Sequence, residues 1–193
     1  MGTAGTVRGM HPTALRPTAL RLVRTFHETF GHPVALSPHV PSARLRQLRI
    51  DLIVEEAAEL EAAAAKNDRV GVADGLADLI VVIAGAALVW GVEPVSASST
   101  SPSVSGEIPG FITATKAQDP EAIAVALGLL WDAVETAALV WNIPLAACVD
   151  EVHASNMSKL GADGQPITRP DGKILKGPNY FRPNLVPILA TSR

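Results

Sequence analysis

The segment at residues 70–90 most strongly limits how this chain can fold. It is apolar at almost every position, and its only ionisable side chains are Asp74 and Asp78. A helix that is apolar on every side must be buried among other elements. The continuous run at residues 76–90 is shorter than the roughly 18 residues of a membrane span, and it contains Asp78. We therefore expect a helix buried in a bundle, and no association with a membrane.

The two aspartates of this segment lie one helical turn apart, so they share a face with side chains about 5–6 Å apart. Two like charges on a buried helix destabilise it unless a positive group lies between them and the neighbouring helix. Asp74 and Asp78 are therefore candidate metal ligands. Interface aspartates bonded to the backbone or to an arginine are the alternative interpretation.

A second group of acids lies in an alanine-rich helical pattern at residues 42–66, which begins at a suitable N-cap, Ser42. At 100° per residue, three leucines of this pattern form one stripe: Leu45, Leu48 and Leu52. Three glutamates continue that stripe: Glu55, Glu56 and Glu59. We expect them to be withdrawn from water, where a carboxylate needs a cation or a proton. A solvated charge run is the alternative.

A short turn at residues 66–69 can join these two helices as an antiparallel hairpin, with Asn67 or Asp68 capping the second. The two acid sets then lie face to face. A cluster with only oxygen ligands selects Mg²⁺, or Mn²⁺, over zinc.

The composition agrees with a helical fold. Hydrophobic residues make up 48% of the chain and aromatic residues only 4%, which suits packed helices better than a sheet. The fold class expected is all-α. A net charge of −3 argues against a nucleic-acid polymer as partner. The single cysteine, Cys148, excludes an intrachain disulfide and fits a reducing, cytoplasmic location.

Outside the hairpin, local signals predict three further helices and three irregular segments. The helices are expected at residues 20–33, 121–141 and 145–160. The irregular segments are a flexible N-terminal extension at residues 1–20, a Ser/Pro/Gly-rich loop or linker at 95–110, and a turn-rich tail from residue 161. Residues 86–94 (AALVWGVEP) partly recur at 137–145 (AALVWNIPL), through partial duplication or through chance similarity.

The tail is basic, because five bases face only two acids, Asp163 and Asp171, between residues 156 and 185. These bases are Lys159, Arg169, Lys173, Lys176 and Arg182. Lysines neutralise phosphate oxygens as point charges, so a basic segment beside an acidic metal site suits a polyphosphate. A solvated basic tail is the alternative, and Tyr180 can either stack on a base or anchor the tail.

The hairpin resembles a known family. The segment RIDLIVEEAAEL, followed by VADGLADLIVVIAGAAL, is similar to the MazG-like all-α nucleoside triphosphate pyrophosphohydrolases, which have an EExxE motif on one helix and an ExxD-type motif on the next. Glu55, Glu56 and Glu59 match the first motif and Asp78 the end of the second. Gly75 stands where the ExxD glutamate is expected, and Asp74 supplies an acid one residue earlier. The resemblance continues at residues 26–34 and 151–185. Residues 95–140 look like an insertion in a domain at 21–193.

The resemblance implies Mg²⁺-dependent hydrolysis of a (d)NTP between its α- and β-phosphates, in a bundle completed by a second subunit. The expected metal ligands are Glu56, Glu59, Asp74 and Asp78, with Glu55 orienting or deprotonating the attacking water. The expected substrate-binding residues are Asn156 and Lys159, which form an NxxK motif, with Lys173, Lys176 and Tyr180.

Three alternatives stay open at this point. One is a phosphoribosyl-ATP pyrophosphohydrolase, which shares the chemistry and the fold class. Another is a house-cleaning enzyme that prefers dUTP or dCTP. The third is a nucleotide-binding regulatory bundle that has lost activity through the change at Gly75.

Overall fold

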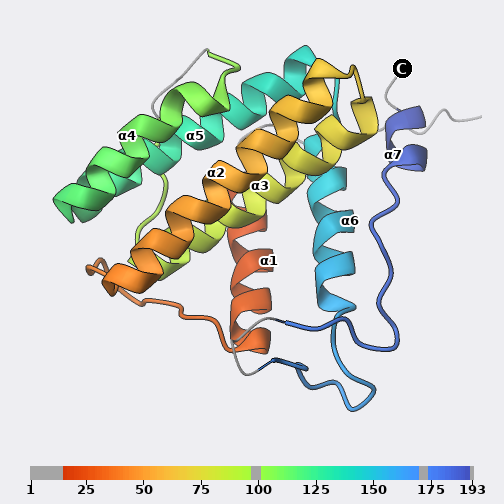
Figure 1. The fold of residues 1–193 in the computed structure, drawn as a ribbon, viewed down its shortest axis with the longest axis horizontal. Coiled ribbons are helices and arrows are strands. Elements are labelled where there is room, and N and C mark those ends of the chain that lie inside the picture. The colour runs from red at the N-terminus through yellow and green to blue at the C-terminus, as the bar shows by residue number, and fades with distance from the viewer. Residues whose placement is uncertain (1–14, 97–100, 170–173, 192–193) are drawn as a thin grey trace, which may run out of the picture.

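The computed structural model describes residues 15–96, 101–169 and 174–191. This part of the chain contains helices, one isolated bridge between Thr168 and Ile174, and no strand. The predicted all-α fold class is confirmed (Figure 1). The helices are α1 (Leu15–Phe30), α2 (Ala43–Ala65), α3 (Arg69–Trp90), α4 (Val104–Ala117), α5 (Pro120–Val140), α6 (Leu145–Met157) and α7 (Val186–Ala190).

Helices α2 and α3 form the predicted antiparallel hairpin. The side chain of Ser42 accepts a hydrogen bond from the backbone of Leu45 and so caps α2. The side chain of Asp68 caps α3 in the same way. Gly91 ends α3 with a φ of 65°, a left-handed conformation that glycine adopts without strain.

Helices α4 and α5 lie alongside this hairpin and complete a four-helix arrangement within one chain (Figure 1). α4 packs on α2, α5 packs on α3, and α4 and α5 pack on each other. The prediction of a loop at residues 95–110 is therefore wrong for residues 104–110, which form the first half of α4. Pro109 removes one helical hydrogen bond there, but the burial of Val104 and Phe111 outweighs that loss.

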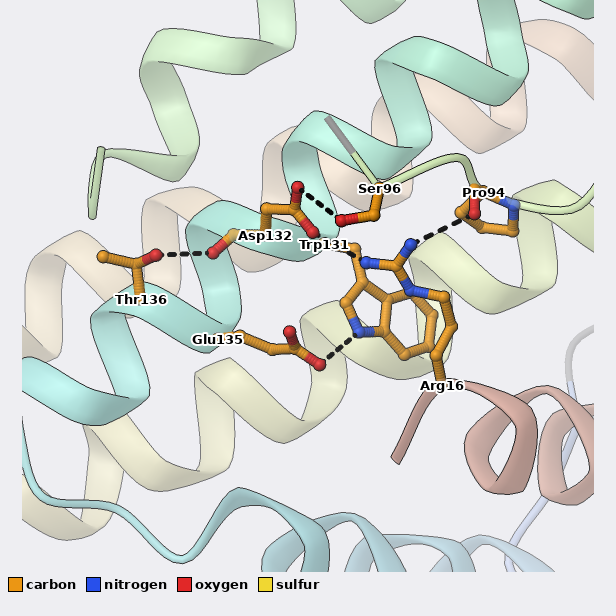
Figure 2. Close-up of polar contacts among 7 residues, drawn as sticks. All are labelled: Arg16, Pro94, Ser96, Trp131, Asp132, Glu135 and Thr136. Atoms are coloured by element: carbon orange, nitrogen blue, oxygen red, sulfur yellow. Dashed lines mark hydrogen bonds and ion pairs between the residues drawn. The ribbon is translucent and has the colours of Figure 1, made fainter. Parts of the chain in front are cut away.

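Helix α1 begins at Leu15, so residues 15–20 are helical and do not belong to a flexible extension. Residues 1–14 lie outside the described residues. The reason for the early start is visible in Figure 2, where Arg16 donates to the Asp132 carboxylate on α5 at 2.7 Å and to the Pro94 carbonyl at 3.1 Å. Its guanidinium also lies 5.3 Å from the ring centroid of Trp131. These contacts fix the first turn of α1 against α5.

Helix α6 packs against α3 and α1 on the other side of the hairpin. Its stripe of Leu145, Val149 and Val152 is buried. The short helix α7 was not predicted; it is held by the buried Leu189, whose carbonyl accepts a hydrogen bond from Arg69 at 3.1 Å.

Helices α3 and α5 are long and apolar enough to cross a membrane by length and composition, with mean hydropathies of 2.1 and 1.8. However, 78% and 61% of these windows are buried inside the molecule, and core helices pass the same test. The signal for a membrane span is therefore weak.

Candidate active site

The five predicted acids share one region of the hairpin, where α2 faces the first half of α3. Burial, followed by the negative charges of the four other acids, raises the pKa of Glu56 to about 8. In order of effect, these acids are Asp78, Glu59, Glu55 and Asp74. The structure therefore brings the two motifs together.

The two aspartates of α3 are also withdrawn from water. Burial, followed by the charge of Asp74, raises the pKa of Asp78 to about 7, while the positive charge of Lys159 opposes this shift. Burial and then the charge of Glu59 raise the pKa of Asp74. The Oδ1 atom of Asp74 is buried and has no hydrogen-bond partner among the described residues. Neither salt bridge in the described part of the chain includes these carboxylates.

The expected stripe on α2 needs a correction. The buried residues of this helix are Arg49, Ile53, Ala57 and Leu60. Leu48 is 44% exposed, and both Glu55 and Glu59 are exposed. The prediction that all three glutamates continue a buried leucine stripe is wrong, because α3 and α4 cover a neighbouring line of the helix. Glu56 lies at the margin of that line and is half-buried.

The departure from the ExxD motif at Gly75 has a structural reason. A Cβ atom at this position would lie 3.2 Å from both the Cα and the Cβ of Leu60 on α2. That distance is too short for an ordinary contact, and the backbone of α2 cannot move aside as a flexible side chain can. A glutamate at position 75 would therefore require α2 to shift by a few tenths of an ångström, whereas Asp74 beside it provides an acid in the same interface.

The donor set suits a hard cation, although the side chains are not gathered around one point. Within the described ranges, no three His, Cys, Asp or Glu side chains converge closely enough to hold a metal ion. All the candidate ligands are carboxylate oxygens, the type that Mg²⁺ and Mn²⁺ prefer. The unpartnered Asp74 oxygen and the desolvated Glu56 and Asp78 are groups that a cation would stabilise. The chemistry of these side chains therefore suits a divalent cation.

The end of α6 and the tail supply positive groups beside the acids. Lys159 Nζ donates to Asn156 Oδ1 at 2.6 Å. Burial lowers the pKa of Lys159, while the charges of Tyr180 and Asp78 raise it. Lys176 Nζ lies 4.4 Å from the centroid of the Tyr180 ring. Four of the five predicted substrate-binding residues thus lie in one region, and the fifth, Lys173, lies outside the described residues.

A cavity of about 880 Å³ adjoins the acids. Its walls include Leu52 of α2, which lies one turn before Glu56, and Val82 of α3, which lies one turn after Asp78. Its volume is in the range of small-molecule sites and suits a nucleoside.

Sequence reasoning missed three of the polar residues that line this cavity, which are His27, His32 and Arg49. A signal was present for Arg49, because it lies four residues before Ile53 and so occupies the buried line of α2. Cys148 lies in the core, where burial raises the pKa of its thiol to about 11.

Comparison with known families adds an independent observation. Residues 23–100 match a family model. The matched family is phosphoribosyl-ATP pyrophosphohydrolase. It is a member of the MazG-like all-α pyrophosphohydrolase superfamily, whose enzymes act on phosphoric anhydrides and generally depend on a divalent metal. The match covers less than half of the chain, but it includes α2, α3 and all five acids.

Residues from 101 onward, including α4 to α7 and the basic tail, lie outside the matched segment. No curated protein and no solved structure matches the chain. The match therefore supports a pyrophosphohydrolase of the MazG-like type, without deciding its substrate.

Proposed function

We propose that this protein is a Mg²⁺-dependent nucleoside triphosphate pyrophosphohydrolase, which cleaves a (d)NTP between the α- and β-phosphates to a (d)NMP and pyrophosphate. One observation carries the proposal: desolvated carboxylates from two helices face each other beside Lys159, in the segment that matches a pyrophosphohydrolase family.

The residues divide the chemistry between them. Glu56, Glu59, Asp74 and Asp78 would hold Mg²⁺, or Mn²⁺, which polarises phosphoryl oxygens and acidifies a water molecule. The exposed carboxylate of Glu55 accepts a proton from the attacking water, whose oxygen bonds to phosphorus as the bridging P–O bond breaks. Lys159 neutralises charge on the departing pyrophosphate. Lys176 provides a second positive charge, and Asn156 holds the Lys159 ammonium group in place.

A second candidate is phosphoribosyl-ATP pyrophosphohydrolase. It breaks the same bond of a larger nucleotide, and the family match favours it directly. A preference for dUTP or dCTP is a narrower form of the first proposal. A regulatory bundle differs from all of these, because it binds nucleotide without turnover.

A nucleotide panel tests the proposal. Purified protein is incubated with each canonical (d)NTP and with phosphoribosyl-ATP, with Mg²⁺, with Mn²⁺ or with EDTA. Pyrophosphate and orthophosphate are measured separately. We expect metal-dependent release of pyrophosphate without orthophosphate. Nucleotide binding without any turnover contradicts the enzyme and supports the regulatory bundle.

We also propose a homodimer in the cytoplasm. The outer face of α2 motivates the dimer, because Leu48 there is 44% exposed beside the exposed Glu55 and Glu59. Light scattering after size exclusion tests this, and a monomeric mass at micromolar concentration contradicts it.

A further inference from the structure

Arg49 is a buried donor without an acceptor. Its relative exposure is 5%, and it lies on the core-facing line of α2 with Ile53 and Ala57. Its Nε atom is buried and has no hydrogen-bond partner in the described part of the chain, and neither of the salt bridges there includes it. Burial lowers the pKa of its guanidinium to about 10, so the group is still charged at pH 7. An unpaired buried group destabilises a fold, so stability does not explain why an arginine occupies this position.

The guanidinium lines the cavity of about 880 Å³ together with the ring of His27. Arg49 Nη1 and His27 Nε2 each lie 3.1 Å from the point where a Cβ on Gly85 would stand, so the two groups lie close together over α3. His27 Nδ1 lies 3.0 Å from the Pro33 carbonyl oxygen. Because a carbonyl only accepts, Nδ1 carries a proton. Burial lowers the pKa of His27 to about 4, so the ring is neutral at pH 7 and Nε2 is an acceptor.

The cavity therefore presents a donor beside an acceptor. Arginine has only N–H donors, so a ligand must offer it an acceptor, whereas His27 Nε2 must be met by a donor. In a flat heterocycle the complement is a keto oxygen beside a ring N–H, the lactam edge found in uracil, thymine, guanine and hypoxanthine. The corresponding edge of cytosine and adenine has an amino group beside an unprotonated ring nitrogen. That edge reverses both positions.

The rest of the lining suits a nucleobase. One wall is the ring of Phe26, which stacks on His32 with centroids 5.6 Å apart, and another is the apolar side chain of Leu52. The acid on the lining, Asp51, is exposed and accepts a hydrogen bond from Gln47 at 2.7 Å. Aromatic and apolar walls around a few convergent polar groups favour a flat ring with a polar edge.

We propose that this cavity binds the base of the substrate and selects bases with a lactam edge, with Arg49 donating to the keto oxygen and His27 accepting from the ring N–H. This inference rests on the proposed function and narrows its substrate class to (d)NTPs of such bases. Arg49 precedes Glu56 by seven residues, which places their Cα atoms about 10 Å apart along α2. That separation leaves room for a nucleoside whose base lies at Arg49 and whose phosphates lie at the acids.

The arrangement rejects amino bases for a physical reason. The sugar and the phosphates fix the orientation of the base, so cytosine cannot turn its keto oxygen toward Arg49. Its amino group would face the guanidinium donors and leave both groups unpaired, and such a mismatch is costly in a site that reads hydrogen bonds. Hydrolytic deamination replaces this amino group by a keto oxygen. It is therefore the class of reaction that supplies uracil and hypoxanthine nucleotides to this pocket.

The experiment compares the wild type with Arg49→Met, Arg49→Gln and Arg49→Lys. Arg21→Gln is the matched control, since Arg21 is exposed on α1 and donates to Thr18. The kcat/KM for pyrophosphate release is measured with two pairs of substrates, dUTP with dCTP and dITP with dATP, whose members differ only in the edge described above. Titration calorimetry with dUMP and with dCMP in EDTA measures binding without metal or turnover. Melting temperatures report folding.

We expect the wild type to prefer the keto member of each pair by roughly 10²-fold or more. Arg49→Met should lower this preference roughly tenfold or more. Arg49→Gln should bring it close to unity, because the amide can turn either its oxygen or its amino group toward the base. Arg49→Lys should retain more of it, because lysine is also only a donor. Arg21→Gln should leave it unchanged, and dUMP should bind more tightly than dCMP only while Arg49 is present.

Other outcomes overturn the inference in separable ways. Equal kcat/KM within each pair, or a preference that Arg49→Met and Arg49→Gln leave unchanged, overturns the reading of the base. A loss of dUMP and dCMP affinity by the same factor shows that Arg49 contacts phosphate instead. Because Arg49→Met removes an unpaired buried charge, its melting temperature should equal or exceed that of the wild type. A lower melting temperature with unchanged preference shows a structural role.

The proposed function can fail separately. If the wild type hydrolyses no nucleotide, the enzyme is excluded. Tighter binding of dUMP than of dCMP that depends on Arg49 then still supports the base pocket, and equal binding of the two overturns it.

Discussion

The five acids of the site differ in their exposure to water, and this difference separates their expected roles. Glu56 and Asp78 are desolvated, with pKa values raised to about 8 and about 7. Burial also raises the pKa of Asp74. Such groups gain most from a cation. Glu55 is exposed at the edge of the cluster, where it can exchange a proton with water.

Glu55→Gln tests this division of roles. The substitution keeps the shape of the side chain but removes the proton acceptor, so we expect pyrophosphate release to fall about 10²-fold or more. Metal binding should persist, because the four proposed ligands are unchanged; titration calorimetry with Mn²⁺ measures it. Turnover near the wild-type rate would exclude Glu55 as the base.

Asp78→Asn tests the metal role of a desolvated acid. In metal-free protein at pH 8, removing the buried charge should raise the free energy of unfolding by about 1–3 kcal/mol. With saturating Mg²⁺ the wild type should become more stable than Asp78→Asn, because the wild type gains stability from the ion and the variant gains little. Thermal unfolding with Mg²⁺ and with EDTA measures both.

The control for this experiment is Asp150→Asn, which changes an exposed acid on α6. This control should change the melting temperature only slightly, both with Mg²⁺ and with EDTA. Equal stabilisation of the wild type and Asp78→Asn by Mg²⁺ would exclude Asp78 from the metal site.

At the scale of elements, the separation of α2 and α3 depends on Gly75. A methyl group there would lie 3.2 Å from the Leu60 backbone, so Gly75→Ala should lower the free energy of unfolding by about 1–3 kcal/mol. Gly110→Ala is the matched control, because no atom lies within 4 Å of its Cβ position on α4. It should raise that free energy by about 0.5–1 kcal/mol. Urea unfolding measures both, and an equal effect of the two substitutions would contradict the close approach.

Elements with strong local signals were predicted correctly. Ser42 and Asp68 cap their helices as expected. Asp119 caps α5 and Gly91 ends α3. The first half of α4 was missed because its Ser, Gly and Pro residues favour loops. Burial of Val104 and Phe111 against the hairpin overrides that preference, and such packing has no local signature.

The site residues that could be predicted from the sequence are those whose charge conflicts with their burial. Asp74 and Asp78 stand out because the rest of α3 is apolar, and the structure places them near the glutamates. The leucine stripe on α2 misled the prediction, because the helix has two packing partners and periodicity does not reveal which line they cover. Arg49 was missed although it lies four residues before Ile53, on the buried line of α2.

At the scale of the whole molecule, α4 and α5 occupy one side of the acidic hairpin. Ser105 of α4 donates a hydrogen bond to Glu61, which lies on the opposite side of α2 from the cluster. The acids therefore remain uncovered by α4, and the four-helix arrangement forms without closing the site. Glu55 and Glu59 stay exposed on this face of α2, which the substrate and the proposed second subunit would need.

The stability of the whole protein should depend on pH and on Mg²⁺ together. Because the folded form retains protons on Glu56 and Asp78 to higher pH than the unfolded chain does, folding takes up protons between about pH 4.5 and 8. The free energy of unfolding of metal-free protein should therefore fall as pH rises through this window. Below about pH 6.5 His27 acts in the opposite direction, since its lowered pKa makes folding release a proton there.

The effect of the acids should thus be clearest from pH 6.5 to 8. In this range the melting temperature should fall by roughly 2–4 °C per pH unit for each proton that folding takes up. Mg²⁺ displaces those protons, so its stabilisation should grow with pH over the same range. Differential scanning calorimetry at several pH values, with EDTA and with Mg²⁺, measures both trends. Mg²⁺ stabilisation that is independent of pH would show that the ion binds elsewhere.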